Sequence, residues 1–267
     1  MEAKKFKKIK KDCLLTLLFL YKKANAGHIG SSLSCLDILI YLYFVEMKKK
    51  DKFVLSKGHA AAALYTVLAK SGRIPEKLLR TFYADGTLLA AHPPCSGKLK
   101  EIVFGTGSLG HGLSLATGFA LSAKLLKQKF NVYCLLSDGD CNEGSTWEAA
   151  LFAAQHNLSN LVIIIDYNKL QAFGYSKEVI NLENLAEKFR SFNFSVVEAK
   201  DGNSFSDLEK AFLKVKKIRS KQPKVIIAHT IKGKGVSFME DKLEWHYWPM
   251  DAKQYEQAMK EIEENYA

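Results

Sequence analysis

Four short and nearly continuous apolar runs alternate with helical patterns along the second half of the chain. These runs are Val132–Ser137, Leu161–Asp166, Phe194–Glu198 and Lys224–His229. Strands that alternate with helices form parallel βαβ units with right-handed crossovers. Strands rich in Val, Ile and Leu are typical of sheets covered on both faces. The pattern therefore predicts an α/β fold, a doubly wound and mostly parallel sheet with helices on both faces.

The chain is expected to form a single domain, because its 267 residues contain no internal repeat and no linker-like stretch. We expect this domain to span residues 1–267, with a helical N-terminal region at 1–100 and a C-terminal helical arm at about 247–267. Helical patterns cover about 4–24, 34–46, 57–70, 75–83, 111–128, 144–156, 182–192, 205–219 and 252–264. Sheets of this class bind ligands beyond the carboxyl ends of their strands, so functional residues are expected there.

The formal net charge of +11 makes an anionic partner worth considering. Only four of the 39 basic residues are arginine, and residues 1–23 alone contain eight lysines. Surfaces that bind nucleic acid usually combine arginine with aromatic residues on one face. The charge therefore indicates a lysine-rich surface, and we expect no nucleic-acid binding.

The N-terminus is similar to a secretory signal, with lysines before the apolar run Cys13–Tyr21 and a small-residue site after it. Apolar residues nevertheless recur at steps of three and four, as on one buried helix face. The recurring residues are Phe6, Ile9, Cys13, Leu17 and Leu20. The run is too short to span a membrane, and the five cysteines form no CxxC pair. We expect an amphipathic first helix, no membrane segment and a cytoplasmic protein.

Polar residues follow two of the predicted strands at the point where each strand ends. Asp138-Gly139 follows the first strand, and Asn168 follows the second, 30 residues further along the chain. Because neighbouring parallel strands lie about 4.8 Å apart, both side chains can reach one ion. Oxygen ligands suit Mg²⁺ or Ca²⁺ with phosphate oxygens completing the shell, and Gly139 lets the backbone approach a phosphate. The spacing favours a metal–diphosphate site.

Two plainer interpretations compete with this one. The segment Asp138-x-Asp140-x-Asn142 is similar to the start of an EF-hand loop, but Glu143 and Ala149 stand where that loop requires Gly and Glu. Asp138 and Asn168 could also be turn residues after strands, as either would usually be alone. Their spacing of one βαβ unit favours the metal site over the turns.

The segment Gly105–Gly110 satisfies the pattern G-x-G-x-x-G and precedes a helical pattern. As a dinucleotide-binding loop it would need a strand at Ile102–Phe104 and would use Asp138 as the ribose acid. That acid lies 28 residues past Gly110, which is long for this motif. A nicotinamide-dependent oxidoreductase therefore stays open as an alternative, as does a tight loop whose glycines allow positive φ.

At these residues the sequence resembles the N-terminal, diphosphate-binding half of transketolase, and the resemblance covers nearly the whole chain. The matching segments are AGHIGSSLSCLDIL (26–39), DKFVLSKGHAAAALY (51–65), HPP (92–94), GTGSLGHGLSLATGFAL (105–121), LLSDGDCNEGSTWEAA (135–150), DYNKLQAFG (166–174) and HTIKGKGVSFMEDKLEWH (229–246). The resemblance implies a thiamine diphosphate-binding fold and a transfer of a two-carbon ketol unit between sugars or sugar phosphates.

The resemblance also assigns roles to particular residues. Asp138, Asn168 and the main-chain oxygen of Leu170 would bind Mg²⁺ or Ca²⁺. The cofactor-binding residues would be Gly107, Leu109, Gly139, Glu143 and Asn168, with Glu143 in a carboxylate network between active sites. The active-site histidines would be His28, His59, His92 and His246. Lys232 and Lys234 either approach a phosphate or are ordinary exposed lysines.

The family's pyrimidine-binding domain, with the glutamate that activates the cofactor, has no counterpart after His246. The resemblance therefore implies a separately encoded C-terminal partner subunit, with an α2β2 heterotetramer as the assembly. Another thiamine diphosphate enzyme component, of the 2-oxoacid dehydrogenase or deoxyxylulose-phosphate synthase type, stays open, and so does a scaffold without activity. Asp140 departs from the family pattern and would add charge near the metal. Tyr247-Trp248 also departs, by adding bulk at the cleft mouth.

Overall fold

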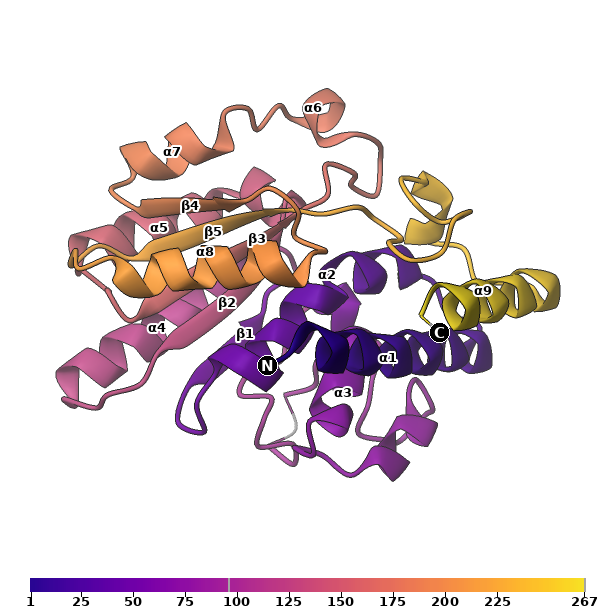
Figure 1. Cartoon of the computed structure of the whole chain (residues 1–267). Coiled ribbons are helices and arrows are strands. Elements are labelled where there is room, and N and C mark those ends of the chain that lie inside the picture. Colours follow the sequence, from indigo (N-terminus) through magenta and orange to yellow (C-terminus); the bar gives the residue numbers. More distant parts are fainter. Residues whose placement is uncertain (96, 267) are drawn as a thin grey trace.

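The computed structural model describes residues 1–95 and 97–266, and within them the strands form one parallel sheet (Figure 1). The strands are β1 (Lys52–Leu55), β2 (Val132–Ser137), β3 (Leu161–Tyr167), β4 (Ser195–Ala199) and β5 (Lys224–His229). Their order in the sheet is β1-β2-β3-β5-β4, and every neighbouring pair is parallel. The predicted α/β class and the four predicted strands are confirmed.

Helices cover both faces of this sheet, as the apolar strands predicted (Figure 1). The longer helices are α1 (Ala3–Ala24), α2 (Ile29–Tyr41), α3 (Ala61–Lys70), α4 (His111–Leu125), α5 (Gly144–Gln155), α7 (Leu185–Ser191), α8 (Phe205–Lys217) and α9 (Ala252–Asn265). The short α6 is Ser176–Val179, a π-helical turn at Leu42–Glu46 extends α2, and 3₁₀ turns lie at Gly58–Ala60, Glu76–Thr81, Gly139–Asn142 and Leu243–His246.

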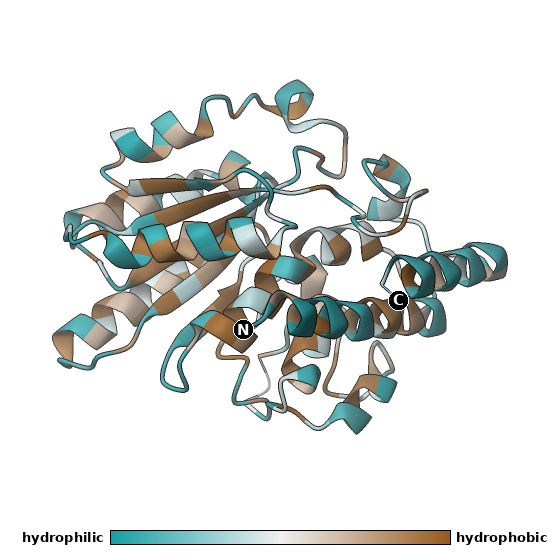
Figure 2. Cartoon of the chain, in the orientation of Figure 1, coloured by the Kyte–Doolittle hydropathy of each residue, from teal (hydrophilic) through white to brown (hydrophobic). Residues whose placement is uncertain are grey.

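Successive strand residues alternate between two hydrophobic cores, because side chains in a strand point to opposite faces. In β3, Ile164 packs into the core shared with α1, α2, α3 and α8, whereas Ile163 and Ile165 pack into the core shared with α4, α5 and α7. Figure 2 shows hydrophobic residues along the strands and hydrophilic residues on the outward faces of α8 and α9. Each fully buried Leu or Ile contributes on the order of 2 kcal/mol.

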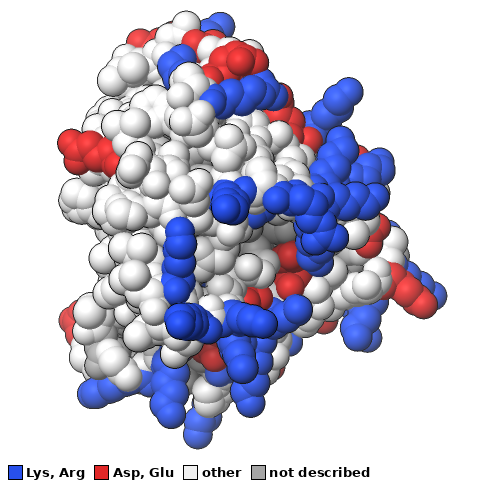
Figure 3. Space-filling view, turned by 90° about the vertical axis from the view of Figure 1, so that its left-hand side faces the viewer, with Lys and Arg blue, Asp and Glu red and all other residues white. Residues whose placement is uncertain are grey.

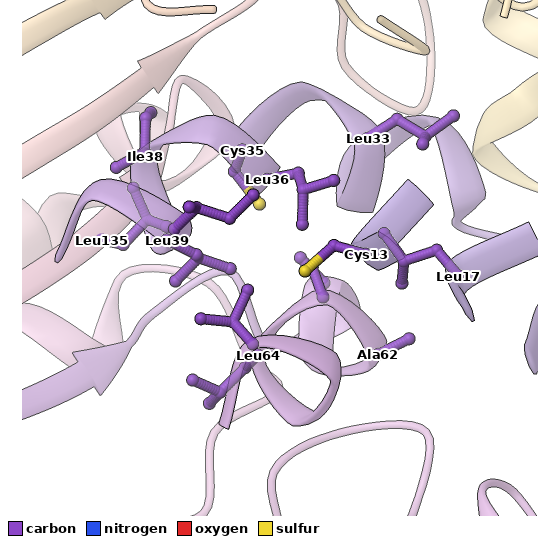
Figure 4. Close-up of a cluster of buried hydrophobic side chains, with 14 of the residues drawn as sticks. Cys13, Leu17, Leu33, Cys35, Leu36, Ile38, Leu39, Ala62, Leu64 and Leu135 are labelled. Atoms are coloured by element: carbon purple, nitrogen blue, oxygen red, sulfur yellow. The ribbon is translucent and has the colours of Figure 1, made fainter. Parts of the chain in front are cut away.

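The first of these cores joins the N-terminal helices to the sheet. Figure 4 shows Cys13 and Leu17 of α1 beside residues of α2 and α3, with Leu135 of β2 in the same cluster. Phe6, Cys13, Leu17 and Leu20 are all buried, so the N-terminal segment is an amphipathic helix of the fold, as predicted. One segment, Ile29–Glu46, is long and apolar enough to cross a membrane, but 89% of it is buried in this core.

The predicted helical region at 1–100 is only partly helical, which corrects one expectation. Residues 52–55 form the edge strand β1, which pairs with β2 from Lys52↔Val132 to Leu55↔Leu135. Its four residues are too short for an alternating pattern to mark them as a strand. The C-terminal α9 packs along α1, where the Lys11 ammonium donates to the Glu263 carbonyl over 3.3 Å. Ser96 and Ala267 fall in predicted regions but lie outside the described residues.

Candidate active site at the carboxyl ends of the strands

A cavity of about 410 Å³ lies beyond the carboxyl ends of the strands, and residues from widely separated parts of the chain line it. The register Ser137↔Asp166 makes β2 and β3 end side by side, so Asp138 and Asn168 leave neighbouring strand ends. Both side chains line this cavity. The predicted site residues that line it are His28, His59, His92, Leu109, Asp138, Gly139, Glu143, Asn168, Leu170 and His246.

The Asp138 carboxylate is buried, with 2% of the residue exposed. Its Oδ1 accepts from the Gly139 amide over 2.9 Å, and its Oδ2 accepts from the Ser176 hydroxyl over 2.5 Å. Burial raises the pKa of Asp138, because the charged form loses hydration there. Each carboxylate oxygen has a second lone pair, so a cation in the cavity could bind Asp138 and offset the loss of hydration.

Asn168 and Leu170 present oxygen atoms from the loop that follows β3. The Asn168 amide nitrogen donates to the Ser34 hydroxyl over 3.3 Å, which orients its Oδ1. That oxygen accepts from the Leu170 amide over 3.0 Å. Lys169 between them has φ of +63°, which reverses the chain direction here. Asn168 and Leu170 therefore lie on the same short turn, next to Asp138.

Lys232 is buried, with only 1% of the residue exposed. Of its two predicted interpretations, the ordinary exposed lysine is therefore wrong. Its ammonium donates to the Leu170 carbonyl over 2.9 Å and lies 2.7 Å from Nδ1 of His246. Burial lowers the pKa of Lys232 to about 8. Lys234 points elsewhere and pairs with Glu240. Lys232 thus places a buried cation on the cavity wall.

The four predicted histidines lie together in the cavity. The ring centroid of His28 is 5.5 Å from that of His59 and 5.0 Å from that of His246. His92 lies 6.4 Å from His28. Burial is the main cause that lowers the pKa of all four, to about 4 for His28 and about 3 for His246. These imidazoles are therefore neutral near pH 7, each with one donor and one acceptor nitrogen.

We expect the free energy of unfolding to fall as the pH is lowered from about 6.5 toward 4. In that window the unfolded chain binds protons that folded His28 and His246 do not, so stability is lost at up to about 1.4 kcal/mol per pH unit per histidine. Urea denaturation of His28→Asn at pH 7, 6 and 5 should show a shallower dependence than the wild type. His156→Gln, at an exposed histidine, serves as the control, and equal slopes in all three proteins would contradict this expectation.

Asp140 holds the glycine loop in place through its carboxylate. The Asp140 Oδ1 accepts from the Gly110 amide over 2.7 Å and from the Ser56 hydroxyl over 2.5 Å. Its Oδ2 accepts from the amide and hydroxyl of Ser137. Asp140 does not line the cavity described above. The Asp140 carboxylate therefore fastens two loops and is not among the oxygen atoms that line the cavity. The expectation that Asp140 adds charge near a metal stays a prediction.

The other members of the glycine loop differ in their relation to the cavity. Leu109 lines it, and a Cβ on Gly139 would come within 3.1 Å of the Leu109 side chain. Gly107 does not belong to the cavity wall and lies against His92, since a Cβ on Gly107 would be 3.7 Å from that ring. Glu143 is exposed at the start of α5. Residues 102–104, which the structure describes, form no strand, so the dinucleotide-binding interpretation loses the strand that it requires.

A buried ion pair at the cavity wall is the main feature that the sequence did not reveal. Lys57 and Asp166 are both fully buried, and the Lys57 ammonium contacts the Asp166 Oδ2. The same Oδ2 accepts from the Ser34 hydroxyl over 2.5 Å, and Thr230 donates to Oδ1. Asp166 is the last residue of the predicted strand Leu161–Asp166, and Lys57 lies two residues before His59, one of the predicted active-site histidines. That proximity to site motifs was the only available signal.

The donor atoms of the cavity suit a hard cation with a phosphorylated cofactor. Asp138, Asn168 and Leu170 offer only oxygen atoms, the ligands that Mg²⁺ and Ca²⁺ prefer. Two buried polar atoms, His28 Nδ1 and Asn142 Oδ1, have no hydrogen-bond partner among the described residues, and both residues line the cavity. Groups of three or more His, Cys, Asp or Glu suited to a transition metal are absent from the described part of the chain. The residues present therefore fit the implied group.

Comparisons with known proteins agree with this site. The family described as "Transketolase, thiamine diphosphate binding domain" matches residues 10–265. The chain is 41% identical over 251 residues to an apulose-4-phosphate transketolase subunit of Phocaeicola vulgatus, covering 91% of this chain and 88% of that protein. It is 38% identical to a 6-deoxy-6-sulfo-D-fructose transketolase subunit of a Clostridium species, covering 90% of each.

Longer transketolases contain a region similar to this chain. Human transketolase is 37% identical over 249 residues, and the chain spans 39% of its length. The crystal structure of transketolase from Campylobacter jejuni superposes with a TM-score of 0.87 at 30% identity, covering 98% of this chain and 43% of that one. The chain therefore belongs to the transketolase family. Within that family of ketol transferases it is an N-terminal, thiamine diphosphate-binding subunit of the kind found in split transketolases.

Proposed function

We propose that this subunit, together with a C-terminal partner subunit, transfers a two-carbon ketol unit from a ketose or its phosphate to an aldose or its phosphate. The observation that carries this proposal is the single cavity that gathers Asp138, Asn168 and the four histidines from both ends of the chain. The family supports thiamine diphosphate as the cofactor. The roles of the individual residues are part of the proposal.

The cofactor's diphosphate and its Mg²⁺ would lie at the ends of β2 and β3. Asp138, Asn168 and the Leu170 carbonyl supply the metal ligands, and Gly139 leaves room for a phosphate against the backbone. The Lys232 ammonium would neutralise part of the diphosphate charge. Leu109 would pack against the aminopyrimidine, and the backbone of Gly107, which lies against the His92 ring, would line it as well. When bound, thiamine diphosphate supplies the carbanion and electron sink that the exchange of carbon–carbon bonds requires.

The histidines would bind the sugar and move its hydroxyl protons. A neutral imidazole can accept a proton from a hydroxyl at one nitrogen while the other nitrogen donates to a developing oxyanion. His246 is oriented by the Lys232 ammonium at its Nδ1, which leaves Nε2 for the substrate. His28 sits centrally among His59, His92 and His246. This arrangement can hold one small polar substrate from several sides.

A partner subunit would cover the weakly charged surface of α4 and α5, whose first residues follow the glycine loop and the Asp138 turn. The helices α4 and α5 contain two Asp, Glu, Lys or Arg residues between them, Lys124 and Glu148. Figure 3, which views the left side of Figure 1, shows a broad surface with few charges beside a region dense in lysine and arginine. Exposed apolar residues here are Leu125, Leu126, Leu151 and Phe152. We propose that an α2β2 heterotetramer buries this surface, with Glu143 near the contact.

The relatives suggest the class of sugar, and the thiols suggest the compartment. Two relatives are named for anionic sugars, apulose-4-phosphate and 6-deoxy-6-sulfo-D-fructose. We propose a sugar or sugar phosphate as substrate. Tyr247 is exposed beside His28 and His246, and Trp248 next to it in the chain is exposed as well. The five cysteines are all free, which agrees with a cytoplasmic location.

We expect ketol transfer only when this chain is combined with its partner subunit. The chain would be purified from its native cell to identify a co-purifying subunit, and the two would be assayed alone and together with ketose donors and aldehyde acceptors. Activity of the pair at least about a hundredfold above either subunit would support the proposal. Release of carbon dioxide from 2-oxoacids, saturable binding of NAD(H) without thiamine diphosphate, or a stable and partnerless homodimer would each contradict it.

A further inference from the structure

A chain of three hydrogen bonds runs from Asn142 to the Asp138 carboxylate. The side-chain amide of Asn142 donates to Gln171 Oε1 over 3.3 Å, and the side-chain amide of Gln171 donates to the Ser176 hydroxyl over 3.2 Å. The Ser176 hydroxyl then donates to Asp138 Oδ2 over 2.5 Å. Every donor points toward the carboxylate, so the chain is polarised in one direction. Its last bond, to a carboxylate oxygen, is the shortest of the three.

The loop between β3 and α6 holds this chain in place. Leu170 pairs with Tyr175 in an antiparallel bridge, and the backbone N–H of Gln171 donates to the Gly174 carbonyl over 2.9 Å. Gly174 has φ of +141°, a value that favours glycine. The Ser176 amide closes the base of the hairpin by donating to the Lys169 carbonyl over 2.9 Å. The segment Leu170–Ser176 is therefore one compact hairpin, and we refer to it as the ligand hairpin.

The ligand hairpin contacts the proposed metal site at two places. Its first residue, Leu170, provides a carbonyl to the cavity, and its last residue, Ser176, holds Asp138. Ser176 itself is buried, with 2% exposed. The donor from Ser176 occupies one lone pair of Oδ2, and the Gly139 amide occupies one lone pair of Oδ1. The carboxylate therefore cannot rotate freely, and its remaining lone pairs have a fixed direction.

We propose that Ser176 is a positioning residue for the metal, and that the ligand hairpin sets the placement of two metal ligands together. This inference rests on the proposed metal site. Ser176 orients the Asp138 carboxylate, and Gln171 orients the Ser176 hydroxyl so that its proton points to Asp138. The residues that orient a metal ligand typically change metal affinity by about 10- to 100-fold when they are removed. The role of Ser176 is thus distinct from binding the metal directly.

The test measures the Mg²⁺ concentration that gives half-maximal binding of thiamine diphosphate to the full chain, by isothermal titration calorimetry at a fixed concentration of the cofactor. We expect Ser176→Ala to raise this concentration by about tenfold or more, with full binding recovered at excess Mg²⁺. Ser176→Thr keeps the hydroxyl and should stay within about threefold of the wild type. Its added methyl has room, because Ser176 also borders a neighbouring cavity of about 730 Å³.

Two further variants separate positioning from folding. Gln171 is half-buried, and Gln171→Leu removes the amide that orients the Ser176 hydroxyl. We expect it to raise the required Mg²⁺ concentration by less than Ser176→Ala does. Ser191→Ala removes an exposed hydroxyl that donates only to the Lys188 carbonyl over 2.7 Å, and it should match the wild type. Thermal unfolding would show whether each variant folds. If Ser176→Ala does not fold, the Mg²⁺ requirement of Gln171→Leu tests the positioning role in its place.

The outcomes distinguish this inference from the proposed function. Mg²⁺-dependent binding by the wild type, with Ser176→Ala unchanged within about twofold, would overturn the positioning role and leave the metal site standing. An equal increase in Ser176→Ala and Ser176→Thr would also overturn it, because the hydroxyl would then not matter. Binding by the wild type that does not depend on Mg²⁺ would overturn both the metal site and this inference.

Discussion

The variant Asp138→Ala is expected to lose Mg²⁺-dependent binding of thiamine diphosphate, by roughly a hundredfold or more. Asp138 is the only carboxylate among the three proposed oxygen ligands, and the affinity of oxygen sites for divalent cations depends strongly on the charge of the ligands. Neither the Asn168 amide nor the Leu170 carbonyl can replace that charge. Isothermal titration calorimetry of thiamine diphosphate, with and without Mg²⁺, would measure the loss.

The fold of Asp138→Ala should remain intact. The carboxylate accepts two hydrogen bonds, from Gly139 and Ser176, and burial raises its pKa. We therefore expect a loss of stability that is smaller than the loss in a variant that removes the acceptor of four hydrogen bonds. Asp140→Ala is a matched control in the same turn with the opposite expectation. It removes the acceptor of hydrogen bonds from Gly110, Ser56 and Ser137, and unsatisfied buried donors typically cost about 1–3 kcal/mol each. Unchanged cofactor binding in Asp138→Ala would refute its role as a metal ligand.

The contrast between these two aspartates shows how far the sequence could predict this site. Asp138 was predictable because it follows an apolar strand directly and has Asn168 one βαβ unit later. The hydrogen-bond partners of Asp140 were not predictable, because it lies within the same acidic segment and residue spacing does not tell on which side of a turn a carboxylate points. The 3₁₀ turn at Gly139–Asn142 directs Asp140 to Ser56 and Gly110 and leaves Asp138 in the cavity.

The fold was more predictable than the polar contacts beneath the site. Continuous runs of Val, Ile and Leu identify β2, β3 and β5, because both faces of these strands are buried. The edge strand β4 is only partly buried, and it was identified by its short apolar run between two helical patterns. The edge strand β1 has only four residues, and its segment fell between two helical patterns in the region that was expected to be helical. Ser176 and Lys232 act through partners distant in the sequence, such as Asp138 and His246. Local patterns carry no information about such contacts.

The variant Lys57→Met is expected to lower the free energy of unfolding by about 3–5 kcal/mol. Met has similar length but no charge, so the Asp166 carboxylate would remain buried without its counter-ion. The Ser31 carbonyl would also lose the donor that now lies 3.1 Å away. Burial opposes the charge on Lys57, yet Asp166 outweighs this effect and raises the pKa of Lys57. Urea denaturation followed by circular dichroism would measure the difference.

The double variant Lys57→Met, Asp166→Asn tests whether the uncompensated charge is the cause. Asn keeps an acceptor for the Ser34 or Thr230 hydroxyl and removes the negative charge, so at least half of the lost stability should return. Lys70→Met breaks the exposed pair with Glu76 and should cost no more than about 1 kcal/mol. Two results would contradict this prediction. One is a loss of stability in Lys57→Met no larger than that in Lys70→Met, and the other is a double variant as unstable as the single one. Either would mean that the ion pair does not stabilise the end of β3, from which Asn168 follows. Because Asp166 lies two residues before Asn168, the same measurement shows how strongly the stability of the fold depends on an ion pair next to the proposed metal site.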